Sequence, residues 1–384
     1  MKVYYSLAIC VLAFTNLACQ KNITSSIPMT TLPKNLVIAH RGTTYWAPEE
    51  TEAAMRWARN IGAHYLEFDL QRTKDGYLIA LHDEKLTRTT NIAQKFPDRK
   101  DQPVSNFNYE ELLSLDVGSW FNQTNPDRSR ASFVGLDILT LEDVIQIAEG
   151  NRIKRNADGK RMLIKSKTGR ISSIYEPDPA DNGNRPGIYP ETKVPDLFPG
   201  IEENLLNELI QFGWYHVDVE KLKPVEIKDT NKVKIANSAN RVILQTFSKK
   251  SLATLQSTFH RPIPTCFLLW RGNDPDDLPN DSLNTFKEWI DYGRNHGATI
   301  IGPSIAGAPN NYADLLNPER AAIIRKANLS IHAYSFDTQS QLNKYATYVD
   351  GMFSNRADDA LAYYRRKTKY KYISASDMLD KLGY

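Results

Sequence analysis

The sequence predicts an α/β protein that folds as a (β/α)8 TIM barrel, with a β-hairpin and a small insertion after the second strand. Short apolar strand candidates recur about eight times along the 384 residues, and helical patterns lie between most of them. The alternative is a doubly wound open sheet, but no glycine-rich phosphate-binding loop follows the first strand. We therefore expect one barrel domain over residues 35–370.

The N-terminus is predicted to be a targeting signal that precedes this domain. Lys2 is followed by an apolar run over residues 3–14 that is too short to span a bilayer comfortably. Residues 17–19, Leu-Ala-Cys, resemble the lipobox of bacterial lipoproteins, which implies cleavage of a signal peptide over residues 1–18 and diacylation of Cys19. The alternative is an ordinary secretory signal with an incidental cysteine.

Residues 19–34 are polar, so we expect a tether between lipid and barrel. The protein would then be lipid-anchored in the bacterial cell envelope, facing the periplasm or exposed on the outer-membrane surface, with no other contact to the membrane. A net charge of +3 is too slight to argue for nucleic acid as a partner.

The elements of the predicted barrel follow one another in order. The expected strands are Leu36–His40, Tyr65–Leu70, Gly187–Glu191, Val242–Thr246, Thr265–Trp270, Thr299–Gly302, Leu329–Tyr334 and Gly351–Ser354. The expected helices are Glu50–Asn60, Ile201–Phe212, Lys249–Phe259, Ser282–His296, Pro318–Lys326 and Ala357–Arg366. Because the strands of such a barrel all end at one face, polar side chains at the strand ends should surround one mouth.

The second strand begins a predicted β-hairpin over Tyr65–Asp83. Asp75-Gly76 suits a two-residue hairpin turn, and with these two as the central residues each residue i faces residue 151 − i. That register sets Asp69 opposite His82, with Cβ atoms roughly 5 Å apart. Glu67 and Asp69 are two apart on one strand, so both carboxylates leave the same face.

Two regions interrupt the alternation of strands and helices. Residues 71–137 hold the hairpin and an excursion rich in Asp, Asn, Lys and Pro, whereas residues 151–185 are rich in Gly, Pro and Asp without a clear period. We expect the second region to be a surface hairpin or loop near the rim of the barrel, where it could favour or exclude bulky substrates.

Charged and titratable side chains gather at the predicted strand ends. They are His40 and Arg41 after the first strand, Glu67 and Asp69 in the second, His82 after the hairpin, and Glu191 and Lys193 at the third. Three carboxylates in one ring would repel one another unless a cation lies among them, and oxygen ligands suit Ca²⁺ or Mg²⁺ better than Zn²⁺. The histidines are then free for proton transfer, and the arginine and lysine suit an anionic substrate. Together these groups indicate metal-assisted phosphodiester cleavage.

These residues also resemble a known family. The motifs are HRG at 40–42, PEET at 48–51, LEFDLQRTKDGYLIALHD at 66–83, LDVGSW at 115–120 and IYPETK at 188–193. In combination they resemble the glycerophosphodiester phosphodiesterase family, and the last motif is similar to its periplasmic branch. The resemblance runs from about residue 36 to 366. It implies a (β/α)8 barrel that hydrolyses glycerophosphodiesters to glycerol 3-phosphate and an alcohol with one divalent cation, for which we expect Ca²⁺ rather than Mg²⁺.

The resemblance also implies roles for single positions. The metal ligands would be Glu67, Asp69 and Glu191, the general base and general acid His40 and His82, and the phosphate contacts Arg41 and Lys193. It places Glu49 beside the metal or the glycerol hydroxyls, and His332 and Tyr334 at the substrate, with a structural role as the alternative for His332. Asn355 departs from the family, which usually has aspartate there. For Phe247 and Trp270, which follow their strands, we expect core packing rather than a place in the pocket wall.

Several alternatives remain open at this point. The attacking oxygen could come from water or from the 2-hydroxyl of the substrate itself, through a cyclic phosphate, and either histidine could be the base. The substrate could instead be a lysophospholipid, glycerophosphoinositol or a teichoic-type polymer. A non-catalytic binding lipoprotein would be expected to lack a metal ligand or a histidine, and neither is missing from this sequence.

Overall fold

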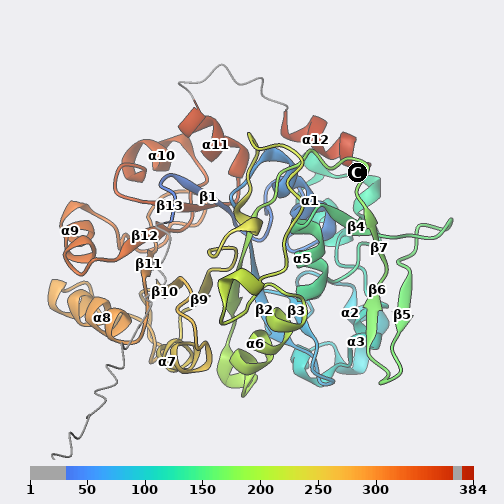
Figure 1. The fold of residues 1–384 in the computed structure, drawn as a ribbon, viewed down its shortest axis with the longest axis horizontal. Coiled ribbons are helices and arrows are strands. Elements are labelled where there is room, and N and C mark those ends of the chain that lie inside the picture. The colour runs from blue at the N-terminus through green and yellow to red at the C-terminus, as the bar shows by residue number, and fades with distance from the viewer. Residues whose placement is uncertain (1–31, 366–373) are drawn as a thin grey trace, which may run out of the picture.

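The computed structural model describes residues 32–365 and 374–384, and its centre is a closed barrel of eight parallel strands (Figure 1). The strands are β1 (Leu36–Ala39), β2 (Tyr65–Arg72), β8 (Gly187–Thr192), β9 (Leu244–Thr246), β10 (Thr265–Leu269), β11 (Ile300–Pro303), β12 (Ser330–Ala333) and β13 (Gly351–Ser354). The barrel closes at β1, where Leu36 lies opposite Gly351 of β13 and Ile38 lies opposite Tyr65 of β2. The predicted (β/α)8 TIM barrel is confirmed.

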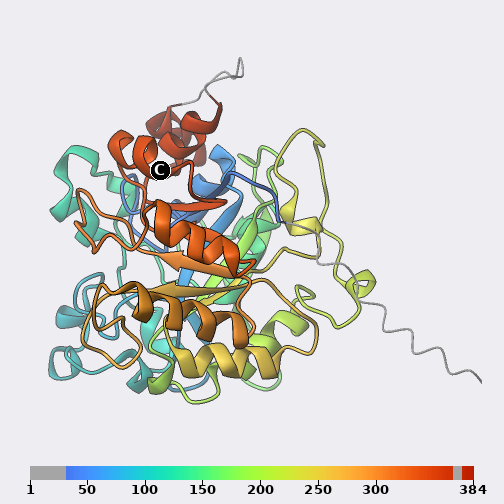
Figure 2. The ribbon, with the colours of Figure 1, turned by 90° about the vertical axis from the view of Figure 1, so that its left-hand side faces the viewer.

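A helix follows each barrel strand and packs outside it. These helices are α1 (Glu52–Ile61), α5 (Leu141–Ala148), α6 (Ile201–Gln211), α7 (Lys249–Thr258), α8 (Leu283–Asn295), α9 (Pro318–Lys326), α10 (Gln339–Tyr345) and α11 (Ala357–Arg365). Figure 2 shows the ring of helices from the side of α8 and α9. Six of the eight match predicted helices. The other two, α5 and α10, are short and begin at capping boxes on Thr140 and Thr338, which satisfy the first free N–H groups.

The interior of the barrel is filled with side chains, so a ligand can enter only at one end. Tyr189 lies at the centre of this filling, with its ring centre 5.8 Å from that of Tyr65 and 5.1 Å from that of Phe353. Cys266 is fully buried beside them, and burial raises the pKa of its thiol to about 12. A thiol with so high a pKa stays protonated, which makes Cys266 a packing residue.

The β-hairpin after β2 exists, but its predicted register is wrong by one residue. Leu70 pairs with Ala80 of β3 (Leu78–Ala80), so residue i faces residue 150 − i, and Asp69 accepts a backbone hydrogen bond from Leu81, not from His82. The loop has three residues instead of two, because the Asp75 carboxylate accepts the backbone N–H of Tyr109 and does not form a tight two-residue turn. His82 nevertheless reaches the mouth of the barrel, one residue beyond this ladder.

The insertion after the hairpin consists of short helices that pack beside the mouth. They are α2 (Ile92–Lys95), α3 (Tyr109–Leu112) and α4 (Ser119–Thr124). Asp116, in the LDVGSW motif, accepts the backbone N–H groups of Gly118 and Ser119 and so begins α4. A side chain at Gly118 would lie 1.9 Å from the carbonyl oxygen of Phe133, so only glycine fits there. This segment carries Asp83 and Arg88 to the rim of the pocket.

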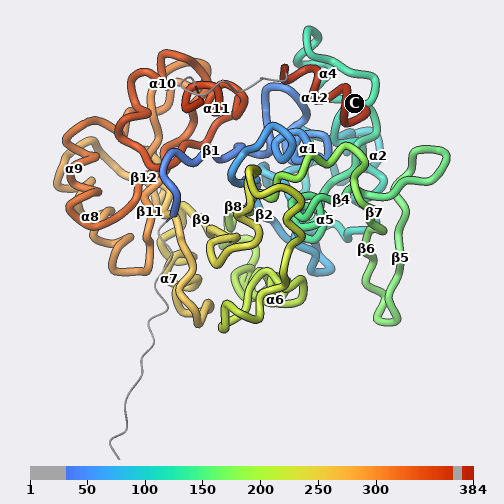
Figure 3. The backbone as a smooth tube through the Cα atoms, turned by 45° about the horizontal axis from the view of Figure 1, so that its top comes forward, coloured from blue at the N-terminus to red at the C-terminus, as the bar shows by residue number. Residues whose placement is uncertain are grey.

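Residues 151–185 form a surface hairpin, as predicted, but not one that lines the pocket. Its two short sheets pair β4 (Asn151–Ile153) with β7 (Tyr175–Pro177), and β5 (Leu163–Lys165) with β6 (Ile171–Ser173). Figure 3 shows them standing out from the barrel on the side opposite α8 and α9. The base is held to α1 by Asp178, which accepts hydrogen bonds from Arg56 and Arg59. No residue of this region is among those that line the pocket. The expected effect of the region on substrate choice would therefore have to be indirect.

The chain continues past the predicted end of the domain at residue 370. Helix α12 (Ala375–Leu382) packs on α1, where Trp57 donates its indole N–H to the carbonyl oxygen of Ala375 over 3.0 Å. Within the described residues, no helix is both long and apolar enough to cross a membrane. The predicted signal peptide over residues 1–18, Cys19 and most of the predicted tether lie outside the described residues.

Candidate active site

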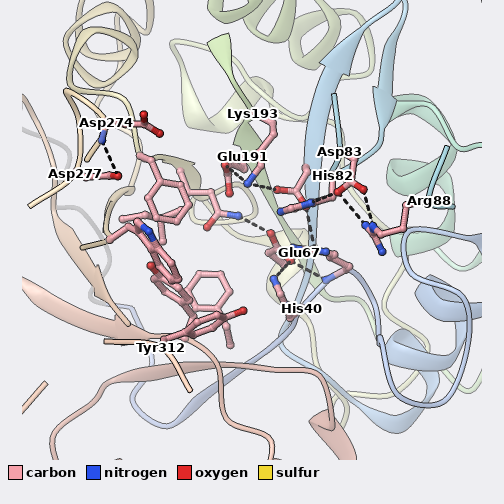
Figure 4. Close-up of a pocket in the computed structure, with 18 residues that line it drawn as sticks. His40, Glu67, His82, Asp83, Arg88, Glu191, Lys193, Asp274, Asp277 and Tyr312 are labelled. Carbon is pink, nitrogen blue, oxygen red and sulfur yellow. Dashed lines mark hydrogen bonds and ion pairs between the residues drawn. The ribbon is translucent and has the colours of Figure 1, made fainter. Parts of the chain in front are cut away.

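A pocket of about 580 Å³ opens at the carboxyl ends of the barrel strands. It is lined by His40, Arg41, Glu67, Asp69, His82, Asp83, Arg88, Glu191, Lys193, Gln245, Phe247, Leu268, Trp270, Asp274, Asp277, Tyr312, Tyr334 and Phe353 (Figure 4). The structure therefore brings together eight predicted site residues, from five separate stretches of sequence, around one mouth: His40, Arg41, Glu67, Asp69, His82, Glu191, Lys193 and Tyr334.

Three buried carboxylates lie at the floor of this pocket. Glu67 and Asp69 share one face of β2, and Asp69 lies directly opposite Glu191 in the parallel pairing of β2 with β8. One oxygen from each lies within 4.8 Å of the others. This geometry follows from strand register alone, because the i, i+2 spacing and the parallel pairing fix all three positions.

The electrostatics of the three carboxylates indicate that a cation belongs among them. Burial and the charge of Asp69 raise the pKa of Glu67 well above its usual range, and burial raises the pKa of Glu191 to about 8. Burial also opposes ionisation of Asp69, but the positive charges of Lys193 and His82 outweigh it and lower its pKa. Asp69 Oδ2 is buried and forms no hydrogen bond, and its partner is the Arg41 guanidinium, with which it forms an ion pair at 3.2 Å. A buried donor set made only of carboxylate oxygens fits a hard divalent ion.

Two polar groups hold Glu67 in place, and only one of them was expected at the site. Glu67 accepts the backbone N–H of Arg41 at 2.7 Å through one oxygen and the amide of Gln245 at 2.7 Å through the other. Gln245 lies on β9, paired with Glu191 of β8. The sequence offered one signal for it, a polar residue inside an otherwise apolar strand.

Arg41 and Lys193 are the cations closest to the carboxylates. Arg41 lies 3.2 Å from Asp69, and Lys193 lies 3.1 Å from Glu191 and 3.5 Å from Asp69. Arg41 has a left-handed backbone with φ 51°, and the next residue, Gly42, packs so closely on α1 that a Cβ would lie 2.8 Å from the Ala54 backbone. In the HRG motif, Gly42 therefore allows the chain to pack closely on α1, and Arg41 places its guanidinium beside the carboxylates.

The two histidines flank the carboxylates and have different partners. His40 Nδ1 lies 2.6 Å from Oδ1 of Asn355, and its Nε2 lies 4.0 Å from Glu67. His82 Nδ1 lies 2.7 Å from Asp83. Burial, helped by the charge of Arg41, lowers the pKa of His40 to about 3, and burial also lowers the pKa of His82. The His40 ring is therefore neutral at neutral pH, and in both histidines Nδ1 is held by an oxygen, which leaves Nε2 to react.

Glu49 lies behind the two arginines at the pocket, and its predicted place beside the metal or the glycerol hydroxyls stays a prediction. Its carboxylate lies 3.1 Å from Arg41 and 2.6 Å from Arg88, and it is absent from the pocket lining. Burial opposes its ionisation, but Arg41 and Arg88 lower its pKa, so it stays charged. Arg88 in turn binds Asp83, the partner of His82. Glu49 therefore orients the guanidinium groups beside the site, because its oxygens are already taken by them.

His332 lies inside the barrel. It is fully buried, hydrogen-bonded to the Tyr189 hydroxyl at 3.1 Å, and it does not line the pocket. These contacts favour the structural alternative for His332, and its predicted contact with the substrate stays a prediction. Tyr334 does line the pocket with its ring, while its hydroxyl donates to the carbonyl oxygen of Leu269 at 2.7 Å.

The side of the pocket away from His82 is aromatic. Phe247 and Trp270 pack against the buried Tyr189 cluster, as expected. They also line the pocket, which was not expected, because each follows directly after its strand at the mouth of the barrel. Tyr312, which sequence reasoning missed, comes from a loop after β11 and stacks edge-on against Trp270 with ring centres 5.0 Å apart. Asp274 and Asp277 lie beside these rings (Figure 4).

Comparisons with known proteins match this chain to one family. Residues 40–172 match the model of the glycerophosphoryl diester phosphodiesterase family. A Bacillus subtilis glycerophosphodiester phosphodiesterase is 28% identical over 324 residues, covering 84% of each chain. A Caldanaerobacter subterraneus glycerophosphodiester phosphodiesterase is 30% identical over 201 residues, covering 52% of this chain and 63% of the relative.

Solved structures share the fold. A glycerophosphodiester phosphodiesterase from Agrobacterium tumefaciens superposes with a TM-score of 0.52 at 22% identity, over 85% of this chain and 98% of that one. An Oleispira antarctica phosphodiesterase, in complex with the product sn-glycerol-3-phosphate, superposes with a TM-score of 0.53 at 18% identity, over 86% of this chain and 96% of that one. At these identities the likeness establishes the barrel fold alone.

Proposed function

The chain belongs to the glycerophosphoryl diester phosphodiesterase family, and on that premise we propose that it hydrolyses glycerophosphodiesters to sn-glycerol 3-phosphate and an alcohol. The observation that carries the proposal is the buried group of Glu67, Asp69 and Glu191, with one histidine on each side of it in a single pocket. An acid–base pair beside a cation site is the arrangement that phosphodiester hydrolysis needs.

Glu67, Asp69 and Glu191 would hold the divalent ion, which when bound polarises the phosphoryl oxygens and neutralises their charge. We propose Ca²⁺ rather than Mg²⁺, because three carboxylates together form a protein-rich ligand set, whereas Mg²⁺ is usually held by one or two carboxylates and several waters. Arg41 and Lys193 add positive charge at the same place, where it would bind the phosphate and stabilise the charge that develops in the transition state.

His40 suits the role of general base. Burial lowers the pKa of His40 and outweighs the hydrogen bond to the neutral amide of Asn355, which favours the protonated ring, so Nε2 stays unprotonated and able to accept a proton. Asn355 also hydrogen-bonds the Asp337 side chain. Because the amide donates to that carboxylate, its oxygen is left to accept from Nδ1–H of His40, which fixes the tautomer.

His82 suits the role of general acid. Its partner Asp83 is a carboxylate, and its side chain is 29% exposed against 17% for His40, so the protonated ring is better tolerated there. Arg88 orients Asp83 by donating a hydrogen bond to its carboxylate, and Glu49 in turn forms an ion pair with Arg88. His40 would take the proton of the attacking oxygen, from water or the substrate's own hydroxyl, and His82 would protonate the leaving alcohol.

The test of this function is metal-restored hydrolysis by the full chain. Protein dialysed against a chelator is expected to release no sn-glycerol 3-phosphate from glycerophosphodiesters, and to regain activity with Ca²⁺ more than with Mg²⁺, measured by a coupled glycerol 3-phosphate assay. Chelated protein that remains fully active would contradict the proposed cation site. A folded protein inactive on every glycerophosphodiester, with every metal, would overturn the function.

A second prediction concerns Asn355. Asn355→Leu removes the acceptor of His40 Nδ1–H, so the ring loses its fixed tautomer, and we expect kcat to fall roughly 10- to 100-fold with KM little changed. Asn355→Asp keeps the acceptor and should restore most of the rate, with the acidic limb of the pH–rate profile moved upward because a carboxylate favours the protonated ring. Equal losses in both variants would mean that Asn355 acts only in packing.

We also propose that the protein is a lipoprotein anchored through Cys19, although that residue lies outside the described part of the chain. The support is the Leu-Ala-Cys sequence after a short apolar run. Cys19→Ala is expected to abolish lipid labelling and to move the protein from the detergent phase to the aqueous phase. Labelling that persists in this variant would rule the anchor out.

A further inference from the structure

We propose that the surface hairpin over residues 151–185 binds to the surface of a bilayer that contains anionic phospholipids. Five exposed residues of the hairpin would make the contact, and we call them the basic strip: Lys160, Leu163, Ile164, Lys165 and Lys167. The sequence predicts no membrane contact other than a lipid anchor at Cys19, so the basic strip would be a second one. This inference depends neither on the proposed reaction nor on the anchor.

Positive charge is concentrated in the first part of the hairpin. The whole chain has a net charge of +3, but residues 151–170 hold eight lysines and arginines against one aspartate, which gives this segment a net charge of +7. The rest of the chain is therefore net negative. A segment of this kind is attracted to an anionic surface, and the small net charge of the whole chain conceals it.

The arginines of this segment fasten the hairpin to the body of the protein. Arg161 donates hydrogen bonds to the Tyr109 hydroxyl at 2.8 Å and to Asp143 at 3.3 Å, and Arg170 forms an ion pair with Glu208 at 2.6 Å. The other two arginines of the segment pair with glutamates in the same way. The hairpin is thus held in place, and the charge of each arginine is used inside the protein.

The lysines of the segment are not used in this way. Within residues 32–365 and 374–384, none of its four lysines forms an ion pair with a carboxylate, and three of them are exposed: Lys160, Lys165 and Lys167. Lysine is depleted at protein–protein interfaces, whereas each lysine beside an anionic bilayer strengthens binding roughly fivefold. The charge left over on the hairpin therefore suits a lipid surface better than a folded protein.

Two aliphatic side chains are exposed among these lysines. Leu163 is 41% exposed and Ile164 is 59% exposed, and both belong to β5. Figure 3 shows β5 at the outer edge of the molecule, with β6 between it and the barrel. The inward strand is β6, where the buried Ser173 donates to Asp143 at 2.7 Å. Exposed aliphatic residues flanked by lysines can enter the interfacial layer of a bilayer while the ammonium groups stay at its phosphates.

Other partners fit the basic strip less well. Residues 151–170 contain no aromatic residue on which the bases of a nucleic acid could stack. A second copy of the chain could pair with β5, but a symmetric contact would bring two copies of the basic strip together, and their like charges would repel.

Cosedimentation with vesicles tests the proposal on residues 20–384, which include every described residue and lack the proposed lipidation site. We expect binding at least about tenfold tighter to phosphatidylcholine vesicles that contain phosphatidylglycerol than to phosphatidylcholine alone, and weaker as salt is added. Lys160→Gln/Lys165→Gln/Lys167→Gln should lose this preference. The matched control makes the same charge change at exposed lysines of α2, α9 and α12 and should keep it: Lys95→Gln/Lys326→Gln/Lys381→Gln.

A fluorescent label on β5 tests the contact itself. Ile164→Cys is labelled with a polarity-sensitive dye; Cys266 is buried and stays protonated, so the introduced thiol is the one that reacts. The emission should shift to the blue with phosphatidylglycerol vesicles, because the side chain enters a less polar layer. The same label at Ala322→Cys, an exposed position on α9, should not shift.

Four outcomes would overturn the proposal. They are equal binding to both kinds of vesicle, a lysine variant that binds as its control does, an unchanged emission of the label on β5, and binding to soluble polyphosphate without binding to vesicles. The last would make a soluble polyanion the partner. A dimer of the wild type that forms without vesicles and dissociates in Ile164→Ser would instead make a second copy of the chain the partner.

Discussion

Glu191→Gln is expected to lower kcat/KM by roughly 10³-fold or more while making the chelated protein more resistant to heat. The loss of activity follows because the amide removes one of three carboxylates that would hold the cation at the phosphate. The gain in stability follows because burial, with the charge of Asp69 nearby, penalises the ionised form of Glu191 in the folded protein.

The pH dependence of this gain has a definite sign. The pKa of Glu191 rises from 4.5 in the unfolded chain to about 8 in the fold, so between these values the folded state holds a proton that the unfolded state has released. The metal-free wild type should therefore lose stability as pH rises from 4.5 to 8, and Glu191→Gln should remove that loss. The difference in Tm between the two should be small near pH 4.5 and largest at pH 8 and above.

Melting curves with and without the ion complete the experiment. Ca²⁺ should raise the Tm of the wild type, because an ion that binds only the folded state stabilises it, and should raise that of Glu191→Gln much less. Glu203→Gln makes the same change at an exposed position on α6 and should behave as wild type in every respect. A Glu191→Gln protein that is fully active with Ca²⁺, or one that melts lower than the wild type at pH 8, would contradict this account of the carboxylates.

The main part of the site could be predicted from the sequence because strand geometry is local and periodic. Glu67 and Asp69 must share a face by their spacing, and Glu191 joins them because the ends of neighbouring parallel strands meet at one edge. The eight barrel strands were predictable for the same reason, as short apolar runs separated by helical patterns. Only the helices that are short and depend on caps, such as α5 and α10, were missed.

The residues that orient the reacting groups could not be predicted in this way. Asn355 and His40 are 315 residues apart in the sequence, and only barrel closure between β1 and β13 brings them to 2.6 Å. Gln245 reaches Glu67 across 178 residues in the same manner. Arg88 lies in an irregular insertion, where no period links a residue to a face. Such contacts are set by tertiary packing and leave no local pattern.

In the β-hairpin, a contact with a residue distant in the sequence overrides the two-residue turn that the local sequence favours. The Asp75-Gly76 pair favours a two-residue turn, but the carboxylate of Asp75 is used to bind the first N–H of α3, and the loop takes a third residue. Every cross-strand partner shifts by one as a result. His82 still reaches the site because it lies beyond the paired residues, where the register no longer determines its direction.

His82→Ala is expected to lower kcat on glycerophosphocholine roughly 10³-fold, within the usual range for loss of a general acid. We propose His82 as the acid because Asp83, 2.7 Å from Nδ1, favours the protonated ring, whereas His40 faces the neutral amide of Asn355. A substrate whose leaving group needs no proton should therefore escape most of this loss. The p-nitrophenyl ester of glycerol 3-phosphate is such a substrate, because p-nitrophenolate leaves readily as an anion.

The two histidine variants should thus differ on the two substrates. His82→Ala should be severely impaired on the choline ester and nearly normal on the p-nitrophenyl ester, whereas His40→Ala should be impaired on both, because activation of the attacking oxygen is needed whatever leaves. His216→Ala, at a histidine outside the pocket, is the control. The reverse pattern would exchange the roles of His40 and His82, and it would mean that Asp83 and Asn355 orient the rings without deciding which one carries the proton.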